Sequence, residues 1–347
     1  PPPTAFSGIA DDTTWNFTTS SLLYTYSGPN AGNNDTWNVA GNWDLNPVPS
    51  VVAHVLIADG TFAGAQNGST PAYTGNLTIG ANATLKVWEN DQEAFGTGPI
   101  TMDQDSLLTL RIGAITFNQA FNLLGDATIA VGESSTGHNQ TKNFSQPITG
   151  SHAFTIEGVN GATINLNTAN SFSSLTGDRN FGTNFKIHGK VDDSLGTGDV
   201  TINDTGTLVI EATDGLSDTG TLTLNGNRST KSSSFQKLHM LASDSVGALV
   251  VDGLVYGAAT YGRIGTTASV DYEVSWMSGD EVLTVLTSTG DTISPTSVAI
   301  TDNAPGGEVF LSEQPTVTFT LTFNEPGVFT GSTGDFNSTG TATVNID

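Results

Sequence analysis

The chain has 347 residues, of which 34 are acidic and 10 basic, so that its formal net charge is −24, and it contains no cysteine. The absence of cysteine excludes disulfides and thiol catalysis. Lys and Arg are missing from residues 1–85 and from 264–347, which argues against partners that need clustered positive charge, namely nucleic acid and anionic membrane surfaces.

Neither disorder nor membrane insertion is expected. Only 13% of the residues are charged, about half the usual share of ~25%, but the hydrophobic fraction of 36% with Val, Ile and Leu at strand spacing supports a continuous core. No apolar run approaches the ~18 residues of a membrane span. The absence of cysteine does not decide the compartment, but an acidic surface keeps an extracellular protein soluble, and from the composition and the family resemblance described below we expect a secreted or cell-surface location.

Residues 1–70 are expected to form an N-terminal cap. Trp37 and Trp43 flank the turn residues Gly41 and Asn42 in this segment. Two tryptophans at this spacing can cover the open end of a solenoid, which otherwise exposes core side chains and strand edges. The alternative interpretation is an aromatic platform for sugar rings, because the indole has a flat apolar face and a polar edge.

Residues 71–290 are expected to form a solenoid body, because one short phrase recurs in them. A Thr-Gly pair is followed each time by apolar residues that alternate with Thr and then by a turn residue; the copies are Thr74–Gly80, Thr97–Asp103, Thr197–Asn203 and Thr219–Asn225. The alternation is that of a half-buried strand, and a period of about 22 residues is typical of one coil of a parallel β-helix. The period predicts about eight or nine coils and few helices.

Aromatic and terminal segments complete the predicted body. We expect six phenylalanines to pack in the core or at coil corners, with a ligand groove as the alternative; they are Phe117, Phe121, Phe144, Phe154, Phe172 and Phe185. Hairpin-like sequence between Leu249 and Gly262 is expected to close the solenoid at its C-terminal end.

Residues 291–347 are expected to form part of an immunoglobulin-like β-sandwich. The run Pro315–Phe323 alternates like a strand, but about 55 residues are too few for the ~100 residues and seven strands of such a domain. Either the chain ends before the domain does, or another molecule supplies the missing strand, as in donor-strand complementation.

The chain resembles bacterial surface proteins with autotransporter-associated β-strand repeats. The segments that carry the resemblance are Gly96–Gly98, Gly161–Phe172, Leu195–Ile202, Trp37–Pro49 and Asp252–Gly262, and Pro295–Phe329 resembles a bacterial Ig-like repeat. The resemblance implies a right-handed parallel β-helix displayed on a cell surface, and it implies no activity.

Residues that could carry chemistry are scattered along the sequence. The densest basic group is Lys186, His188 and Lys190, which strand alternation places on one face. It could hold a small anion, or it could be an ordinary solvated face. The remaining histidines, His54, His138, His152 and His239, share no short spacing.

Acidic pairs are equally ambiguous. Asp103 with Asp105, and Asp192 with Asp193, have the composition of a glycosidase pair, although turn formation explains both. The carboxylates of Asp302, Glu308 and Glu325 could bind a calcium ion, and this alternative stays open. No catalytic residue and no cofactor are predicted.

We therefore expect a non-enzymatic extracellular structural protein, an all-β subunit of a surface layer or filament that self-associates by strand pairing at its C-terminal part. The first alternative is an adhesin or polysaccharide-binding module, and the second is a polysaccharide lyase or hydrolase. Neither nucleic acid nor a membrane is an expected partner.

Overall fold

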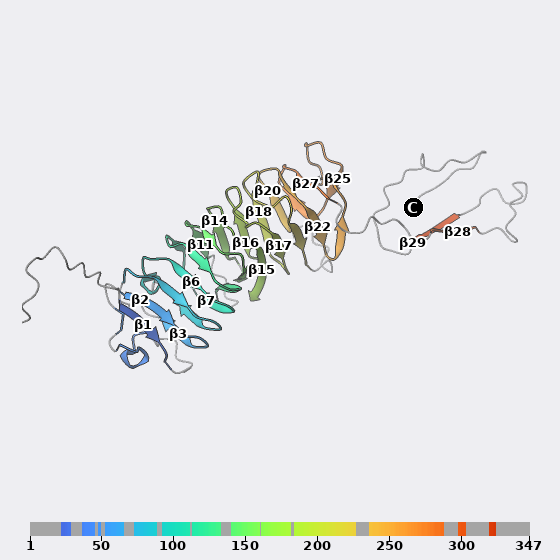
Figure 1. Cartoon of the computed structure of the whole chain (residues 1–347). Helices are drawn as coiled ribbons and strands as arrows, with labels where there is room; N and C mark the ends of the chain where they lie inside the picture. The colour runs from blue at the N-terminus through green and yellow to red at the C-terminus, as the bar shows by residue number, and fades with distance from the viewer. Residues whose placement is uncertain are drawn as a thin grey trace, which may run out of the picture.

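The structure is a computed structural model that describes residues 22–28, 37–45, 48–49, 53–65, 73–88, 92–111, 113–132, 140–159, 161–181, 184–226, 236–287, 298–302 and 319–323. These residues form an all-β chain dominated by a parallel β-solenoid of about seven turns (Figure 1). The predicted fold class is confirmed to that extent. The two helical segments among the described residues are short 3₁₀ turns, η1 (Ala40–Asn42) and η2 (Gln92–Phe95), and neither could cross a bilayer.

Three parallel sheets form the sides of the solenoid, which we call faces A, B and C. Face A contains β1 (Leu22–Tyr26), β2 (Ala53–Ile57), β4 (Leu77–Ile79), β6 (Ile100–Met102), β9 (Phe121–Leu123) and β12 (Ile148–Thr149). Face C contains β8 (Ile115–Phe117), β11 (Thr141–Phe144), β14 (Thr163–Leu166), β16 (Lys186–Gly189), β18 (Thr207–Ile210), β20 (Leu238–Met240) and β26 (Met277–Ser278).

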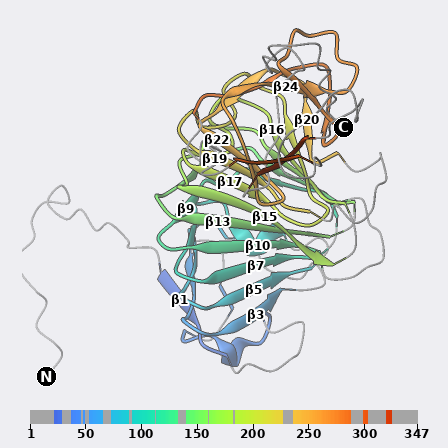
Figure 2. The ribbon, with the colours of Figure 1, turned by 90° about the vertical axis from the view of Figure 1, so that its right-hand side faces the viewer.

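Face B is the longest sheet and forms the ladder of strands in the foreground of Figure 2. It contains β3 (Phe62–Ala65), β5 (Thr84–Val87), β7 (Ser106–Leu110), β10 (Ala127–Val131), β13 (Ala153–Val159), β15 (Ser174–Phe181), β17 (Asp199–Ile202), β19 (Thr221–Leu224) and β22 (Ala248–Val251), with β23 (Leu254–Tyr256) added antiparallel at its end. The predicted strand phrases lie in β4, β6, β17 and β19.

The turns are somewhat longer and fewer than the sequence period predicts. Thr84 pairs with Leu107, 23 residues later, but Thr128 pairs with Thr155, 27 residues later. The extra residues lie between strands, where a solenoid accepts insertions without disturbing the ladder. The expected eight or nine coils are therefore about seven.

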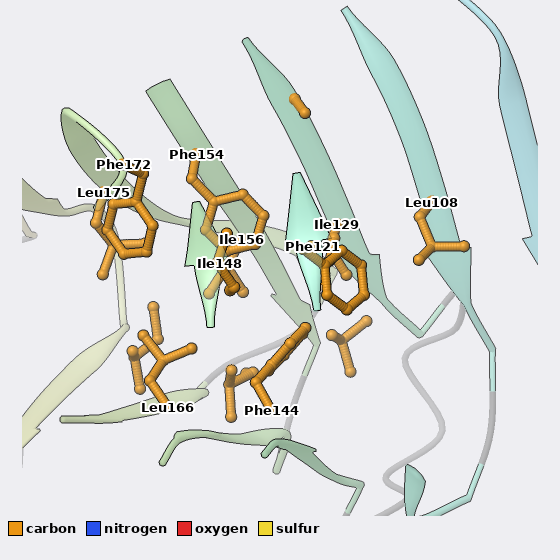
Figure 3. Close-up of a cluster of buried hydrophobic side chains, with 14 of the residues drawn as sticks. Leu108, Phe121, Ile129, Phe144, Ile148, Phe154, Ile156, Leu166, Phe172 and Leu175 are labelled. Carbon is orange, nitrogen blue, oxygen red and sulfur yellow. The ribbon is translucent and has the colours of Figure 1, made fainter. Parts of the chain in front are cut away.

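The core follows from the alternation of inward and outward residues along most strands, such as β14, β17 and β19. Inward residues of all three faces meet in one apolar column that extends from Tyr24 to Val285, and Figure 3 shows its middle section, with side chains from several strands directed into the same interior. All six phenylalanines expected in the core are at most 1% exposed. Phe117 and Phe144, which are paired in register on face C, stack with ring centroids 5.0 Å apart. The core interpretation of these residues is confirmed.

The repeated Gly-Thr-Gly motif has a specific packing role at coil corners, where Gly96–Gly98 precedes β6 of face A and Gly196–Gly198 precedes β17 of face B. Gly196 has φ +85°, and a Cβ there would lie 2.3 Å from the Phe172 ring of the preceding coil. The next residue, Thr197, donates its hydroxyl to the Phe172 carbonyl. Gly98 and Gly198 similarly pass close to the backbone of the preceding coil. Only glycine fits such close approaches, so the motif allows successive coils to stack closely.

Asn170 joins three coils at a corner of the solenoid. Its Oδ1 accepts the Ile148 N–H at 2.7 Å, and its Nδ2 donates to the carbonyls of Thr168 at 3.0 Å and Ser194 at 2.6 Å. The side chain is 5% exposed. Buried backbone groups at a bend need such partners, because the strands no longer supply them.

The first segment, 1–70, contributes strands to the parallel faces: β1, β2 and β3 pair in register with the coil that follows each of them. Trp37 and Trp43 are 0% and 3% exposed and contact each other edge to face at 4.9 Å. Neither indole therefore offers a face to a sugar. Trp15 lies outside the described residues.

The C-terminal end of the solenoid has its own small sheet, formed by β21 (Asp244–Val246), β27 (Leu283–Val285), β24 (Ala259–Arg263) and β25 (Tyr272–Val274). Antiparallel pairing of β24 with β27 and of β22 with β23 interrupts the parallel register. Of residues 291–347, the structure describes only β28 (Val298–Asp302) and β29 (Phe319–Phe323), which form an antiparallel pair.

Candidate functional site

The basic cluster expected from the sequence lies on the outer side of face C. Lys186 and His188 point outward from β16, whereas Ile187 and Gly189 between and beside them are buried. Lys190 follows directly after the strand. The prediction that these three side chains share one face therefore agrees with the burial pattern of β16.

Glu211, from the next coil, changes the character of this cluster. Its Oε1 lies 2.6 Å from His188 Nδ1, and Lys190 Nζ donates to Oε1 and Oε2 at 2.8 and 2.7 Å. The side chains of His188, Lys190 and Glu211 are 18, 31 and 25% exposed. One carboxylate thus balances the charge of Lys190, and the cluster is less cationic than its sequence indicates.

Burial and hydrogen bonding set the protonation of this group. Burial lowers the pKa of His188, against the opposing effect of its hydrogen bond to Glu211. Burial acts to raise the pKa of Glu211, but the hydrogen bonds from His188 and Lys190 outweigh it, so that the pKa is lowered. At neutral pH the carboxylate is therefore ionised and the imidazole neutral. Because a carboxylate only accepts, Nδ1 carries the proton and Nε2 is left as an acceptor.

The cluster continues a stripe of polar side chains that crosses face C. Asn165, opposite His188 in register, donates to Asn143 Oδ1 at 2.7 Å, and Asn143 donates to Thr116 Oγ1 at 3.3 Å. This arrangement is an amide ladder between successive coils. It has an obvious structural use, since each bond links one coil to the next.

Sequence reasoning missed Glu211, although the coil period contains the signal. Glu211 follows His188 by 23 residues and Lys190 by 21, which is one coil. Acidic residues one period after a basic group are therefore the first candidates for its partners in such a chain.

The other candidate residues lie apart from this cluster. His54 Nδ1 accepts the Asn76 N–H, His152 lies 4.0 Å from Asp126, and His239 Nδ1 lies 2.7 Å from Ser278 Oγ. His138 lies outside the described residues.

The acidic pairs lie in turns. Asp103 accepts the N–H of Gln104, and Asp105 and Asp193 have positive φ angles of 56° and 55°. These are features of turn residues, as the turn interpretation predicts.

A metal site would need several ligating side chains close together. Among the described residues, no group of three or more His, Asp or Glu side chains is arranged to hold a metal ion. Of the three residues proposed for calcium, Asp302 lies in β28, and Glu308 and Glu325 are outside the described residues.

Comparisons with protein families, with characterised proteins and with solved structures found no match to this chain.

Proposed function

We propose that the chain is a non-enzymatic, extracellular structural protein, a stiff solenoid subunit of a cell-surface layer or filament. The observation that supports this most directly is the unbroken apolar core from Tyr24 to Val285, bordered by coil-to-coil hydrogen bonds. In such a stack each coil is held by its neighbours, so stiffness extends along the whole body.

The finer features of the proposal follow the resemblance to autotransporter-associated repeats. The solenoid is right-handed, as is usual for a strand, a crossover and a parallel strand in one sheet. Within residues 1–70, whose strands β1, β2 and β3 already belong to the solenoid, the segment around Trp37 and Trp43 acts as a cap, which the burial of the two indoles supports. Residues 291–347 belong to an Ig-like sandwich whose exposed strand edges pair with a neighbouring subunit, and the antiparallel pair β28–β29 is compatible with such a sheet.

Electron microscopy of the purified chain tests the assembly. At physiological salt, with and without a calcium chelator, we expect ordered filaments or sheets. Isolated short rods that stay monomeric at high concentration in sedimentation would refute the proposal.

A pair of variants tests the proposed strand pairing between residues 291–347 and a neighbouring subunit. Replacing Thr320 and Leu321 in β29 together by proline removes two adjacent backbone N–H groups, which point to opposite sides of a strand, so one donor is lost on the open side. Assembly should be lost while the melting temperature of the solenoid is unchanged. Replacing the same two residues by alanine keeps the N–H groups and should preserve assembly.

Polysaccharide binding by an adhesin is the second candidate, and one observation favours it. At the C-terminal end of the solenoid, Tyr272 is 36% exposed and stacks on the buried Tyr261 with ring centroids 5.5 Å apart. Exposed aromatic rings that are held in place by a second ring are common contacts for sugars. Titration of tryptophan fluorescence with a panel of glycans tests this, because Trp276 belongs to the same aromatic group. A Tyr272→Ala variant should lose any response, whereas a spacer protein would give none.

A further inference from the structure

Face B carries a single column of outward threonines. Thr128, Thr155, Thr176, Thr201 and Thr223 occupy five successive strands, and each is paired in register with the next. All five are half-buried, as is normal for outward residues in the middle of a sheet. The strands that carry them belong to the ladder seen in Figure 2.

The column is regular and rigid. Adjacent strands lie ~4.8 Å apart, so the five residues span roughly 19 Å. The one register shift between β13 and β15 falls at Gly158 and Val159, beyond the threonines. Threonine is stiff at χ1, and the inward residues directly behind the column, such as Ile129, Ile156 and Ile202, are fully buried. Methyl and hydroxyl groups therefore repeat along the column at a fixed spacing.

The neighbouring column on the same face does not keep one residue type along the solenoid. It runs through Thr109, Ala130, Glu157 and Asp178. Strand propensity alone favours threonine at any outward position, so it does not explain why one column keeps threonine on five strands while its neighbour changes between β7, β10, β13 and β15.

Outward residues on these strands are also short and lack the groups used by other ligands. Apart from Glu157, the described ones on β10, β13, β15, β17 and β19 are Ala, Ser, Thr or Asp. Aromatic rings that would stack on sugars and basic groups that would bind anions are missing among these described residues.

We propose that the threonine column of face B binds ice. Water beside apolar surface is orientationally restricted, and hydroxyl groups anchor first-shell water by hydrogen bonds. A rigid array that repeats methyl and hydroxyl groups at the strand spacing of ~4.8 Å orders water with a repeat close to the lattice repeat between equivalent oxygens in the basal plane of hexagonal ice. Such a water layer joins a growing ice surface without rearrangement. The inference is independent of the proposed structural function.

The experiment measures thermal hysteresis and ice recrystallisation with the full chain, and adsorption of the fluorescently labelled chain to a single ice crystal. Wild-type protein should adsorb and inhibit recrystallisation at micromolar concentration. Thr201→Tyr, which places a bulky ring in the centre of the column, should reduce the hysteresis at least fivefold. Thr163→Tyr is the matched control, because Thr163 is an outward threonine on face C, and it should behave as wild type.

Circular dichroism on each variant verifies that the fold is kept. Serum albumin serves as the inactive reference protein. If the wild-type chain gives no more thermal hysteresis, recrystallisation inhibition or ice adsorption than albumin, the proposal is overturned, whatever the variants do. Equal losses in the two variants also overturn it, because the effect would then not belong to face B. Binding to microcrystalline cellulose or chitin without any effect on ice would replace ice by a polysaccharide surface and refute the inference.

Discussion

Replacing Asn170 by leucine tests the role of the corner that joins three coils. Leucine has the same number and branching of side-chain heavy atoms but cannot accept the Ile148 N–H or donate to the Thr168 and Ser194 carbonyls. The Ile148 and Ser194 bonds are buried, and leaving a buried polar group without a partner costs about 1–3 kcal/mol. Two such groups predict a loss of about 2–6 kcal/mol in the free energy of unfolding.

Urea unfolding followed by circular dichroism and by tryptophan fluorescence measures this loss. The transition midpoint should fall without a change in the slope m, because the surface exposed on unfolding is the same. Asn165→Leu is the control, since its side chain donates a single partly buried bond, to Asn143, and should cost less than about 1 kcal/mol. If Asn170→Leu costs no more than Asn165→Leu, the corner asparagine does not hold the coils together.

Three further predictions concern backbone strain and buried charge. Gly196→Ala should destabilise by about 2–4 kcal/mol in the same unfolding assay, because it puts a side chain at positive φ and against the Phe172 ring; a loss below about 1 kcal/mol would show that the ring simply moves aside. Lys142 points into the core and donates to the Gly113 carbonyl, and burial lowers its pKa to about 8. The unfolded chain therefore binds more protons above pH 8, so stability should rise with pH between about 8 and 10.5; Lys142→Met should remove this rise and raise the melting temperature at pH 7, and an unchanged pH profile would contradict the assignment. Burial raises the pKa of Asp244 to about 7 despite three backbone N–H donors. Because the folded state binds more protons than the unfolded chain here, Asp244 should make the free energy of unfolding fall as the pH rises from about 4 to 7. In thermal melts across that range, the Asp244→Asn variant should not show this fall. A parallel decline of the melting temperature in wild type and variant would contradict the assignment to Asp244.

Alternation and period were enough to predict the solenoid. The inward residues of β14, β17 and β19 are those that alternation designates, because a strand turns successive side chains to opposite sides whatever its neighbours are. The role of Phe117 and Phe144 in the core follows in the same way.

Only the local part of the candidate site could be predicted from the sequence. His188 and Lys190 are close in the sequence, and their common face follows from local geometry. Glu211 reaches them through the register between β16 and β18, which depends on the length of the intervening loop. Lys142 illustrates the same difficulty: it occupies an inward position in register with Ile115 and Ile164, where alternation alone would predict an apolar residue.

The sequence by itself therefore determined that the chain forms a parallel β-solenoid and which side of most strands faces the core, because these depend on local alternation and on turn residues that repeat. Only the tertiary structure decided which residues of successive coils stand opposite one another. Loops of unequal length set that register, with 21 residues between Leu107 and Thr128 but 30 between Leu208 and Leu238. The partner of His188, the corner bonds of Asn170 and the threonine column of face B all depend on it.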